Sequence, residues 1–83
     1  MIKLIVLMNS QILISKIEEV GADIGEPDCK LIDPYLISER DGTISPWLSG
    51  YSEQNTYMIN SDKILTLFDP KTELLKKYQG VIE

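Results

Sequence analysis

The chain has 83 residues, 43% of them apolar, and carries 8 basic against 13 acidic side chains for a net charge of −5. This length predicts a single domain over residues 1–83, and so small a domain is only marginally stable without an added stabiliser. The single cysteine, Cys29, excludes an intrachain disulfide. Self-association is the remaining stabiliser, so we expect a homo-oligomer. The acidic balance opposes sequence-blind binding to nucleic acid, because lysine and arginine must displace the counterions.

Several classes of protein are disfavoured by what the chain lacks. It has no histidine, the usual general base and a common metal ligand, and no glycine-rich phosphate loop. We therefore expect no enzymatic activity, no cofactor and no bound metal. The N-terminal apolar run is too short to span a bilayer and is not followed by a cleavage signature. With the lone unpaired thiol, this leads us to expect a cytoplasmic protein that does not contact membranes.

The first third of the chain predicts a hairpin. Residues 2–8 and 11–20 are aliphatic and β-branched runs, and Asn9-Ser10 between them supplies turn-forming residues. Side chains alternate between the two faces of a strand, and both faces of the second run begin with apolar residues. We therefore expect one face to pack in the core and the other against a neighbouring element.

The middle of the chain alternates turn-rich and apolar segments. Residues 21–28 predict a loop, and residues 29–38 a third strand in which Pro34 must occupy an edge, a bulge or a sharp bend. Residues 40–54 are polar and turn-rich, so we expect a long connection there. Residues 55–59 predict a fourth strand, 60–62 a tight corner and 63–68 a fifth strand.

A helix is expected at the C-terminus. Asp69 can cap a helix and Pro70 suits its first turn, so we expect the helix over about residues 70–82. The apolar residues of this segment recur at helical spacing and form one stripe. They are Leu74, Leu75, Tyr78, Val81 and Ile82.

Two motifs accompany this order of strands. The first is Leu7-Met8-Asn9-Ser10, followed by Ser15 in the next strand and by Asp28 before the third; the second is Ile59-Asn60-Ser61-Asp62-Lys63-Ile64. Over about residues 3–68, with a gap in the 40s and early 50s, the chain resembles the Sm-like (LSm) fold, most closely its divergent phage-type members. Serine stands where that family has glycine, and Asn60 stands where it has a basic residue.

The resemblance implies a strongly bent, all-β barrel of five strands over residues 2–68, with the C-terminal helix added. It further implies a homo-oligomeric ring of about five to seven protomers, closed by pairing the fourth strand of one copy with the fifth strand of the next. Rings of this family bind single-stranded RNA, so RNA, or alternatively DNA, in nucleic-acid processing is the first function expected. The nucleic-acid-binding residues carried over by position are Asp28, Asn60, Ser61, Asp62 and Lys63. The alternative is a structural or protein-interaction ring that binds no nucleic acid.

Each candidate residue also has a purely structural interpretation. Asparagine and serine at positions 60 and 61 are good turn formers. Lys63 can be a solvated strand residue, and the acidic residues 18–28 a solvated loop that lacks an aromatic side chain to stack on a base. Trp47, Tyr51 and Tyr57 can stack on bases, but burial against a neighbouring loop is the commoner role.

Overall fold

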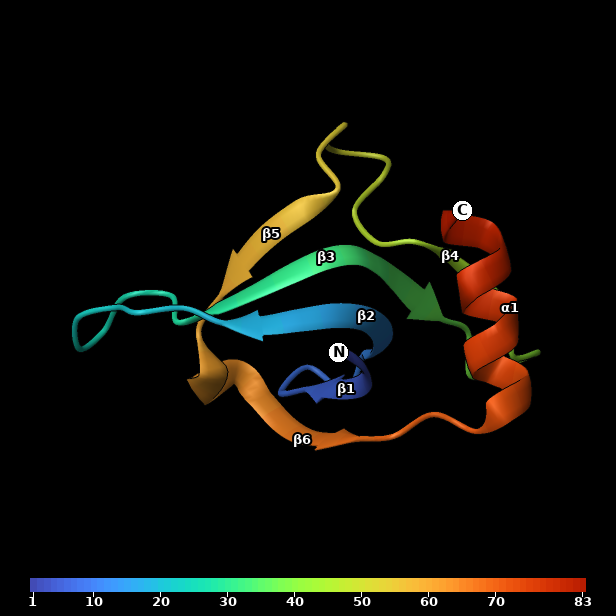
Figure 1. Cartoon of the computed structure of the whole chain (residues 1–83), viewed down its shortest axis with the longest axis horizontal. Helices are drawn as coiled ribbons and strands as arrows, with labels where there is room; N and C mark the ends of the chain where they lie inside the picture. The colour runs from blue at the N-terminus through green and yellow to red at the C-terminus, as the bar shows by residue number, and fades with distance from the viewer.

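A computed structural model describes every residue from Met1 to Glu83, as six antiparallel strands followed by one helix (Figure 1). The elements are β1 (Ile2–Leu7), β2 (Ile12–Glu19), β3 (Cys29–Ile37), β4 (Ile44–Pro46), β5 (Thr56–Ile59), the 3-10 turn η1 (Ser61–Lys63), β6 (Ile64–Phe68) and α1 (Thr72–Ile82). The sheet runs in the order β4-β3-β2-β1-β6, and β5 also pairs with β3. The expected mostly-β fold with a C-terminal helix is confirmed. No pairing joins β5 to β6, so the sheet is open between them.

The sheet has six strands, so the expectation of five strands was wrong. The additional strand β4 lies within residues 40–54, where we expected only a connection, and its Ile44 pairs with Ile37 of β3. Its three residues end in a Ser-Pro pair that is typical of a turn. Pro46 is tolerated because an edge strand does not need every N–H for the ladder. Pairing with β3, not local propensity, makes this segment a strand.

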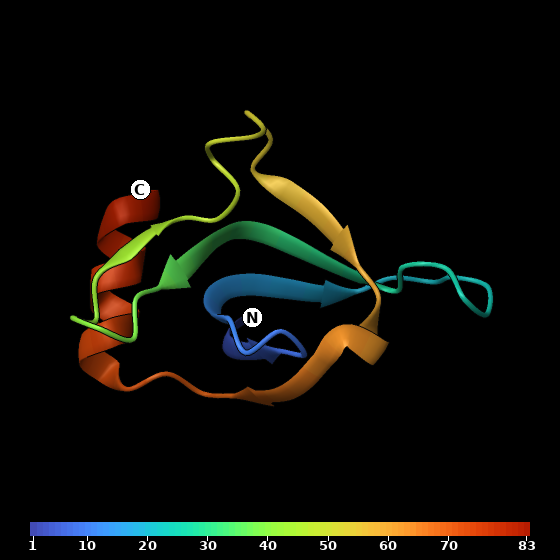
Figure 2. The ribbon, with the colours of Figure 1, turned by 180° about the vertical axis from the view of Figure 1, so that it is seen from behind.

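Strand β3 bends at Asp33 and Pro34, as expected for Pro34. Residues 29–32 of β3 pair with β5, whereas residues 35–37 pair with β4. Asp33 adopts a positive φ of 53°, which is uncommon outside glycine, and Pro34 has no N–H to donate. The bend lets one strand edge serve two partners that leave it in different directions (Figure 2).

Polar side chains satisfy the backbone at this bend. The pairing of β2 with β3 is irregular between Ile14 and Lys16, so ladder hydrogen bonds are lost there. The buried Ser15 hydroxyl lies 3.1 Å from the carbonyl oxygen of Ile32. The Tyr78 hydroxyl of α1 donates to the carbonyl oxygen of Asp33 at 2.7 Å and accepts from the amide of Lys16 at 3.3 Å. The helix therefore supplies a group that the bent strands need.

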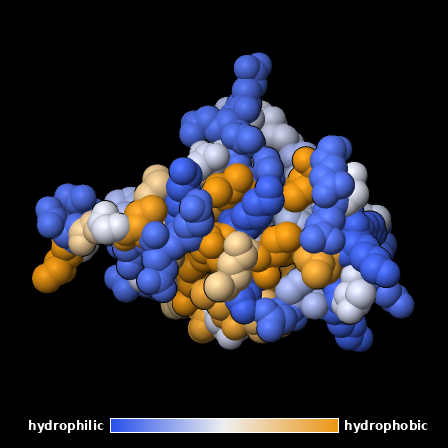
Figure 3. Space-filling view, viewed as in Figure 1, coloured by the Kyte–Doolittle hydropathy of each residue, from blue (hydrophilic) through white to orange (hydrophobic).

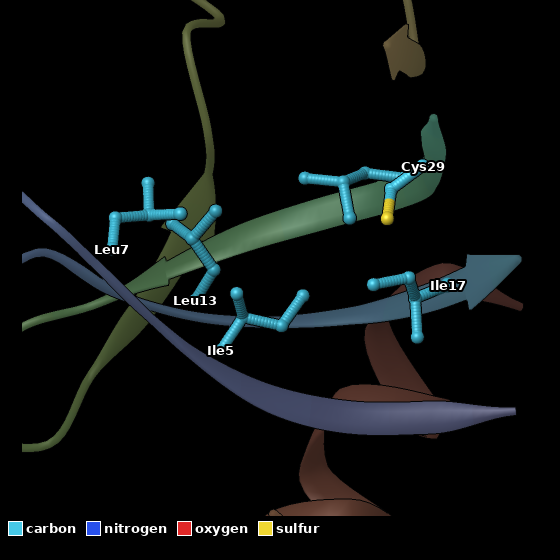
Figure 4. Close-up of a cluster of buried hydrophobic side chains, with 6 residues drawn as sticks. Ile5, Leu7, Leu13, Ile17 and Cys29 are labelled. Atoms are coloured by element: carbon cyan, nitrogen blue, oxygen red, sulfur yellow. The ribbon is translucent and has the colours of Figure 1, made fainter. Parts of the chain in front are cut away.

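Two apolar clusters lie on opposite faces of the sheet. The inner cluster is enclosed by the curl of the strands, and β5 and β6 contribute partly buried residues to it (Figure 4). Its buried members are Ile5, Leu7, Leu13, Ile17, Cys29 and Leu31. The outer cluster consists of Leu4 and Ile14 beneath Tyr78 of α1. Both apolar faces of β2 are thus buried as expected, and the neighbouring element is the helix.

The helix starts later than expected. Its N-cap is Lys71, which makes no capping hydrogen bond with its side chain, so the prediction of Asp69 as the cap was wrong. The carboxylate of Asp69 instead binds the ammonium of Lys3 at 2.6 Å. From the expected stripe, Leu74, Tyr78 and Ile82 pack on the sheet, whereas Val81 is half exposed. No helix in the structure has the length and apolar character needed to cross a membrane.

Candidate functional site

The two segments singled out by the Sm-like resemblance meet in space. Asp28 directly precedes β3, and Ser61 begins η1 after β5. Pairing of Cys29 with Ile59 brings these strand ends together. The Asp28 carboxylate accepts two hydrogen bonds of 2.7 Å, one from the amide of Ser61 and one from its hydroxyl. Residues 33 positions apart thus form one polar junction.

The electrostatics of this junction favour a charged carboxylate and a neutral thiol. The amide and hydroxyl of Ser61 donate to the charged form of Asp28 and so lower its pKa. Burial raises the pKa of Cys29, and the nearby negative charge of Asp28 raises it further. A protonated, buried thiol is a weak nucleophile, so these groups do not form an activated catalytic pair.

Of the other candidate residues, Asn60 makes a hydrogen bond that stabilises the turn, whereas Asp62 and Lys63 are exposed. The side-chain oxygen of Asn60 accepts from the amide of Asp62 at 3.0 Å and caps η1. Asp62 and Lys63 are exposed, and the Lys63 ammonium forms no ion pair within the chain. Asn60 and Ser61 therefore stabilise the turn. Lys63 carries the one positive charge at η1, and that charge is unpaired.

The surroundings of the junction are acidic. The segment between β2 and β3 projects from the same end of the sheet as η1 (Figures 1 and 2). It carries Asp23 and Glu26 on either side of a turn whose Ile24 is fully exposed. A phosphate backbone approaching this end would meet carboxylates first.

The predicted aromatic group is only partly buried. Trp47 packs on the inner cluster and meets Tyr57 edge-on, with 5.7 Å between ring centroids. Its indole N–H lies 3.4 Å from the side-chain oxygen of Gln11. Tyr51 is 92% exposed, so burial was the right interpretation for Trp47 and the wrong one for Tyr51.

The free borders of the sheet carry the most exposed apolar side chains of the strands. β5 pairs only with β3, and β6 pairs only with β1, so each has one edge without a partner strand. Neither strand contains a charged residue. The large apolar side chains on them that are 43% to 66% exposed are Met58, Leu65, Leu67 and Phe68. Apolar atoms gather in the middle of the face shown in Figure 3, over β1, β2 and β6.

A groove of about 490 Å³ lies beside β6, where the sheet is open. Its apolar lining consists of Met1, Ile17, Cys29, Ile64, Leu65 and Leu67. Lys3 and Glu19 add opposite charges to the lining. This groove was not predicted from the sequence. The available signal was the run Ile64–Phe68, where apolar residues occur at both strand parities and so require cover on both faces.

The fold and the site together define a small, antiparallel β protein with a capping helix and unpaired strand edges at β4, β5 and β6. Residues 1–83 match the model of a family described as "Family of unknown function (DUF6561)", and the chain belongs to that family. No curated protein matches the chain.

Proposed function

We propose that the protein is a self-assembling, protein-interaction module, whose copies join through their free sheet edges into a ring of the Sm-like kind. One observation carries the proposal: the two strands that border the opening of the sheet, β5 and β6, are uncharged and have unpaired edges and exposed apolar side chains. No catalytic step is part of this role.

The physical argument starts from the cost of leaving such edges open. Unpaired N–H and C=O groups on an apolar strand are a template for another strand, and natural proteins cover or charge them. Neither β5 nor β6 contains a charge or a proline, the usual protections of an edge. Pairing between copies would satisfy both edges.

The arrangement of the edges favours a closed ring. β5 and β6 are different surfaces of one copy, so a β5–β6 contact is heterologous. Repeating it produces a closed ring when the rotation that relates one copy to the next is a whole fraction of a full turn. The bent β3 and the tight corner η1 support the Sm-like resemblance. In such a ring the gap between β5 and β6 of each copy would be covered by its neighbours, and the barrel that a single copy leaves open would be completed by assembly.

Binding of single-stranded RNA or DNA in nucleic-acid processing is the second candidate. It is favoured by the contact between Asp28 and Ser61, which gathers the segments that carry the binding residues in Sm-like proteins. It ranks second because Ser61 and the Asn60 oxygen are already engaged, and because Lys63 is outnumbered by nearby carboxylates.

A charge placed at the free edge tests self-assembly. Leu67 of β6 and Val81 of α1 are 46% and 47% exposed, so they form a matched pair. We expect Leu67→Lys to convert the wild-type oligomer into a 9.4 kDa monomer in light scattering after size exclusion, because the ammonium would be buried in the contact. Val81→Lys should remain oligomeric. A monomeric wild-type protein, or an oligomer unaffected by Leu67→Lys, would refute assembly through this edge.

A binding assay separates the two candidates. Fluorescence anisotropy with oligo-U and oligo-A at low and high salt should show no binding while the oligomer stays intact. Salt-dependent binding that is lost on Lys63→Ala would instead establish the second candidate, because each phosphate contact contributes to the salt slope. Lys76→Ala on the exposed face of α1 is the control of equal charge change.

A further inference from the structure

The groove beside β6 opens into the inner cluster. Ile17 and Cys29 belong to that buried cluster and also line the groove, so the floor of the groove is continuous with the core. Both side chains lie at the same end of the cluster (Figure 4). The wall includes Leu65, which is 66% exposed. An apolar ligand would be stabilised here, and about 490 Å³ lies within the range of roughly 300–1,000 Å³ typical of small-molecule sites.

Two charged side chains reach the groove because side chains alternate between the faces of a strand. Lys3 lies two residues before Ile5 of the inner cluster, and Glu19 lies two residues after Ile17. Both therefore belong to the inner face of the sheet, near strand ends where the core no longer covers them. The groove thus combines an apolar floor with an ammonium and a carboxylate in its lining.

The two charges differ in whether the chain already provides a partner. The ammonium of Lys3 binds the carboxylate of Asp69 at 2.6 Å, whereas Glu19 forms no ion pair within the chain. A further carboxylate, that of Asp28, is held by Ser61 of the groove lining. The uncompensated charge at the groove is therefore negative.

We propose that the groove binds a small amphiphilic amine, whose ammonium pairs with Glu19 and whose hydrocarbon chain covers the apolar floor at Ile17 and Cys29. An ammonium donates charge-assisted hydrogen bonds to a carboxylate. An anionic amphiphile would instead bring its head group towards an unpaired carboxylate, and it could bind Lys3 only by displacing Asp69. The site is complete within one copy, so it does not depend on the proposed assembly.

The thiol on the floor of the groove reports on its occupation. Burial raises the pKa of Cys29, and the negative charges of Asp28 and Glu19 raise it further. The thiol is therefore protonated and reacts slowly. Because Cys29 is the only cysteine of the chain, its rate of alkylation by an uncharged reagent measures access to this floor alone.

Isothermal titration calorimetry with octylamine, octanol and octanoate tests the proposal at constant chain length. We expect the wild type to bind octylamine, to bind octanol more weakly and not to bind octanoate. Glu19→Gln should weaken octylamine binding by about five- to tenfold. Unchanged octanol binding would show that the groove of this variant is intact. Glu18→Gln is the matched control, because Glu18 is also exposed, lies on the opposite face of β2 and gives the same change of charge.

Alkylation of Cys29 by N-ethylmaleimide then locates the bound amine. We expect octylamine to slow the reaction in proportion to the occupied fraction, and an unchanged rate despite binding would place the amine elsewhere and overturn the proposal. Equal losses of affinity in Glu18→Gln and Glu19→Gln would overturn it too, because they indicate attraction to the net charge of −5. So would octanoate binding as tight as that of octylamine, or no binding of octylamine. A monomeric wild type that binds octylamine at Cys29 would refute only the self-assembly.

Discussion

Replacing Tyr78 with phenylalanine removes a single oxygen from the contact between α1 and the sheet. The Tyr78 side chain is wholly buried, and its ring meets Tyr35 edge-on with 5.7 Å between centroids. The phenylalanine ring keeps that contact, so the substitution tests the hydroxyl alone. Without the hydroxyl, the Asp33 carbonyl oxygen loses a bond of 2.7 Å and the Lys16 amide loses one of 3.3 Å.

The expected cost follows from the groups left unpaired. A buried polar group that loses its partner costs roughly 1–3 kcal/mol, and we expect about 2 kcal/mol for Tyr78→Phe because Pro34 and the irregular pairing at Ser15 offer no replacement donor. At about 4–8 °C per kcal/mol for a domain of this size, the melting temperature should fall by roughly 8–16 °C.

Thermal unfolding followed by circular dichroism measures this shift, and urea unfolding checks that the midpoint moves while the m-value does not. Tyr51→Phe is the control, because it removes the same hydroxyl group from a side chain that is 92% exposed. A melting temperature of Tyr78→Phe within about 2 °C of the wild type would show that the hydroxyl does not hold the bend together, against the reasoning from unpaired groups.

Three further predictions concern pH and the helix start. Burial raises the pKa of Tyr78 from 10 to about 12, so between these pH values the Tyr78 hydroxyl ionises only in the unfolded chain. The free energy of unfolding should therefore fall as pH rises from 10 towards 12. Urea titrations should show this loss in the wild type and not in Tyr78→Phe. Because Ser61 lowers the pKa of Asp28, the stabilisation by this contact should be present above pH 3.8 and lost as pH falls through the lower folded-state pKa. Ser61→Ala should weaken the dependence of the unfolding free energy on pH in this acidic range. An unchanged pH dependence would exclude this contact as its source. Lys71→Asp should raise the unfolding free energy by about 1 kcal/mol, since Lys71 makes no capping bond with its side chain, and a lower urea midpoint would contradict this.

The sequence predicted those elements whose signal is local. The runs at residues 2–8 and 11–20 are apolar and β-branched, and they became β1 and β2 with ends moved by one residue. Pro34 predicted a bend because proline has no backbone N–H to donate to a neighbouring strand, whatever its surroundings. The family resemblance named Asp28 and Ser61 as candidate site residues, but the hydrogen bonds between them were not predicted, since no local property links residues so far apart.

The features that were missed depend on distant partners. β4 forms a strand because Ile44 pairs with Ile37 of the bent strand β3. The three residues of β4 do not predict this pairing by themselves. Asp69 fails to cap the helix because Lys3, 66 positions away, binds its carboxylate. The groove beside β6 likewise arises only when strands from both ends of the chain come together.

The most direct test of the account is the mass of the wild-type protein in solution. Native mass spectrometry over a range of concentrations should give one assembly of about five to seven copies, because a heterologous β5–β6 contact ends when the ring closes. A 9.4 kDa species at every concentration would contradict the claim that identical copies complete the open sheet.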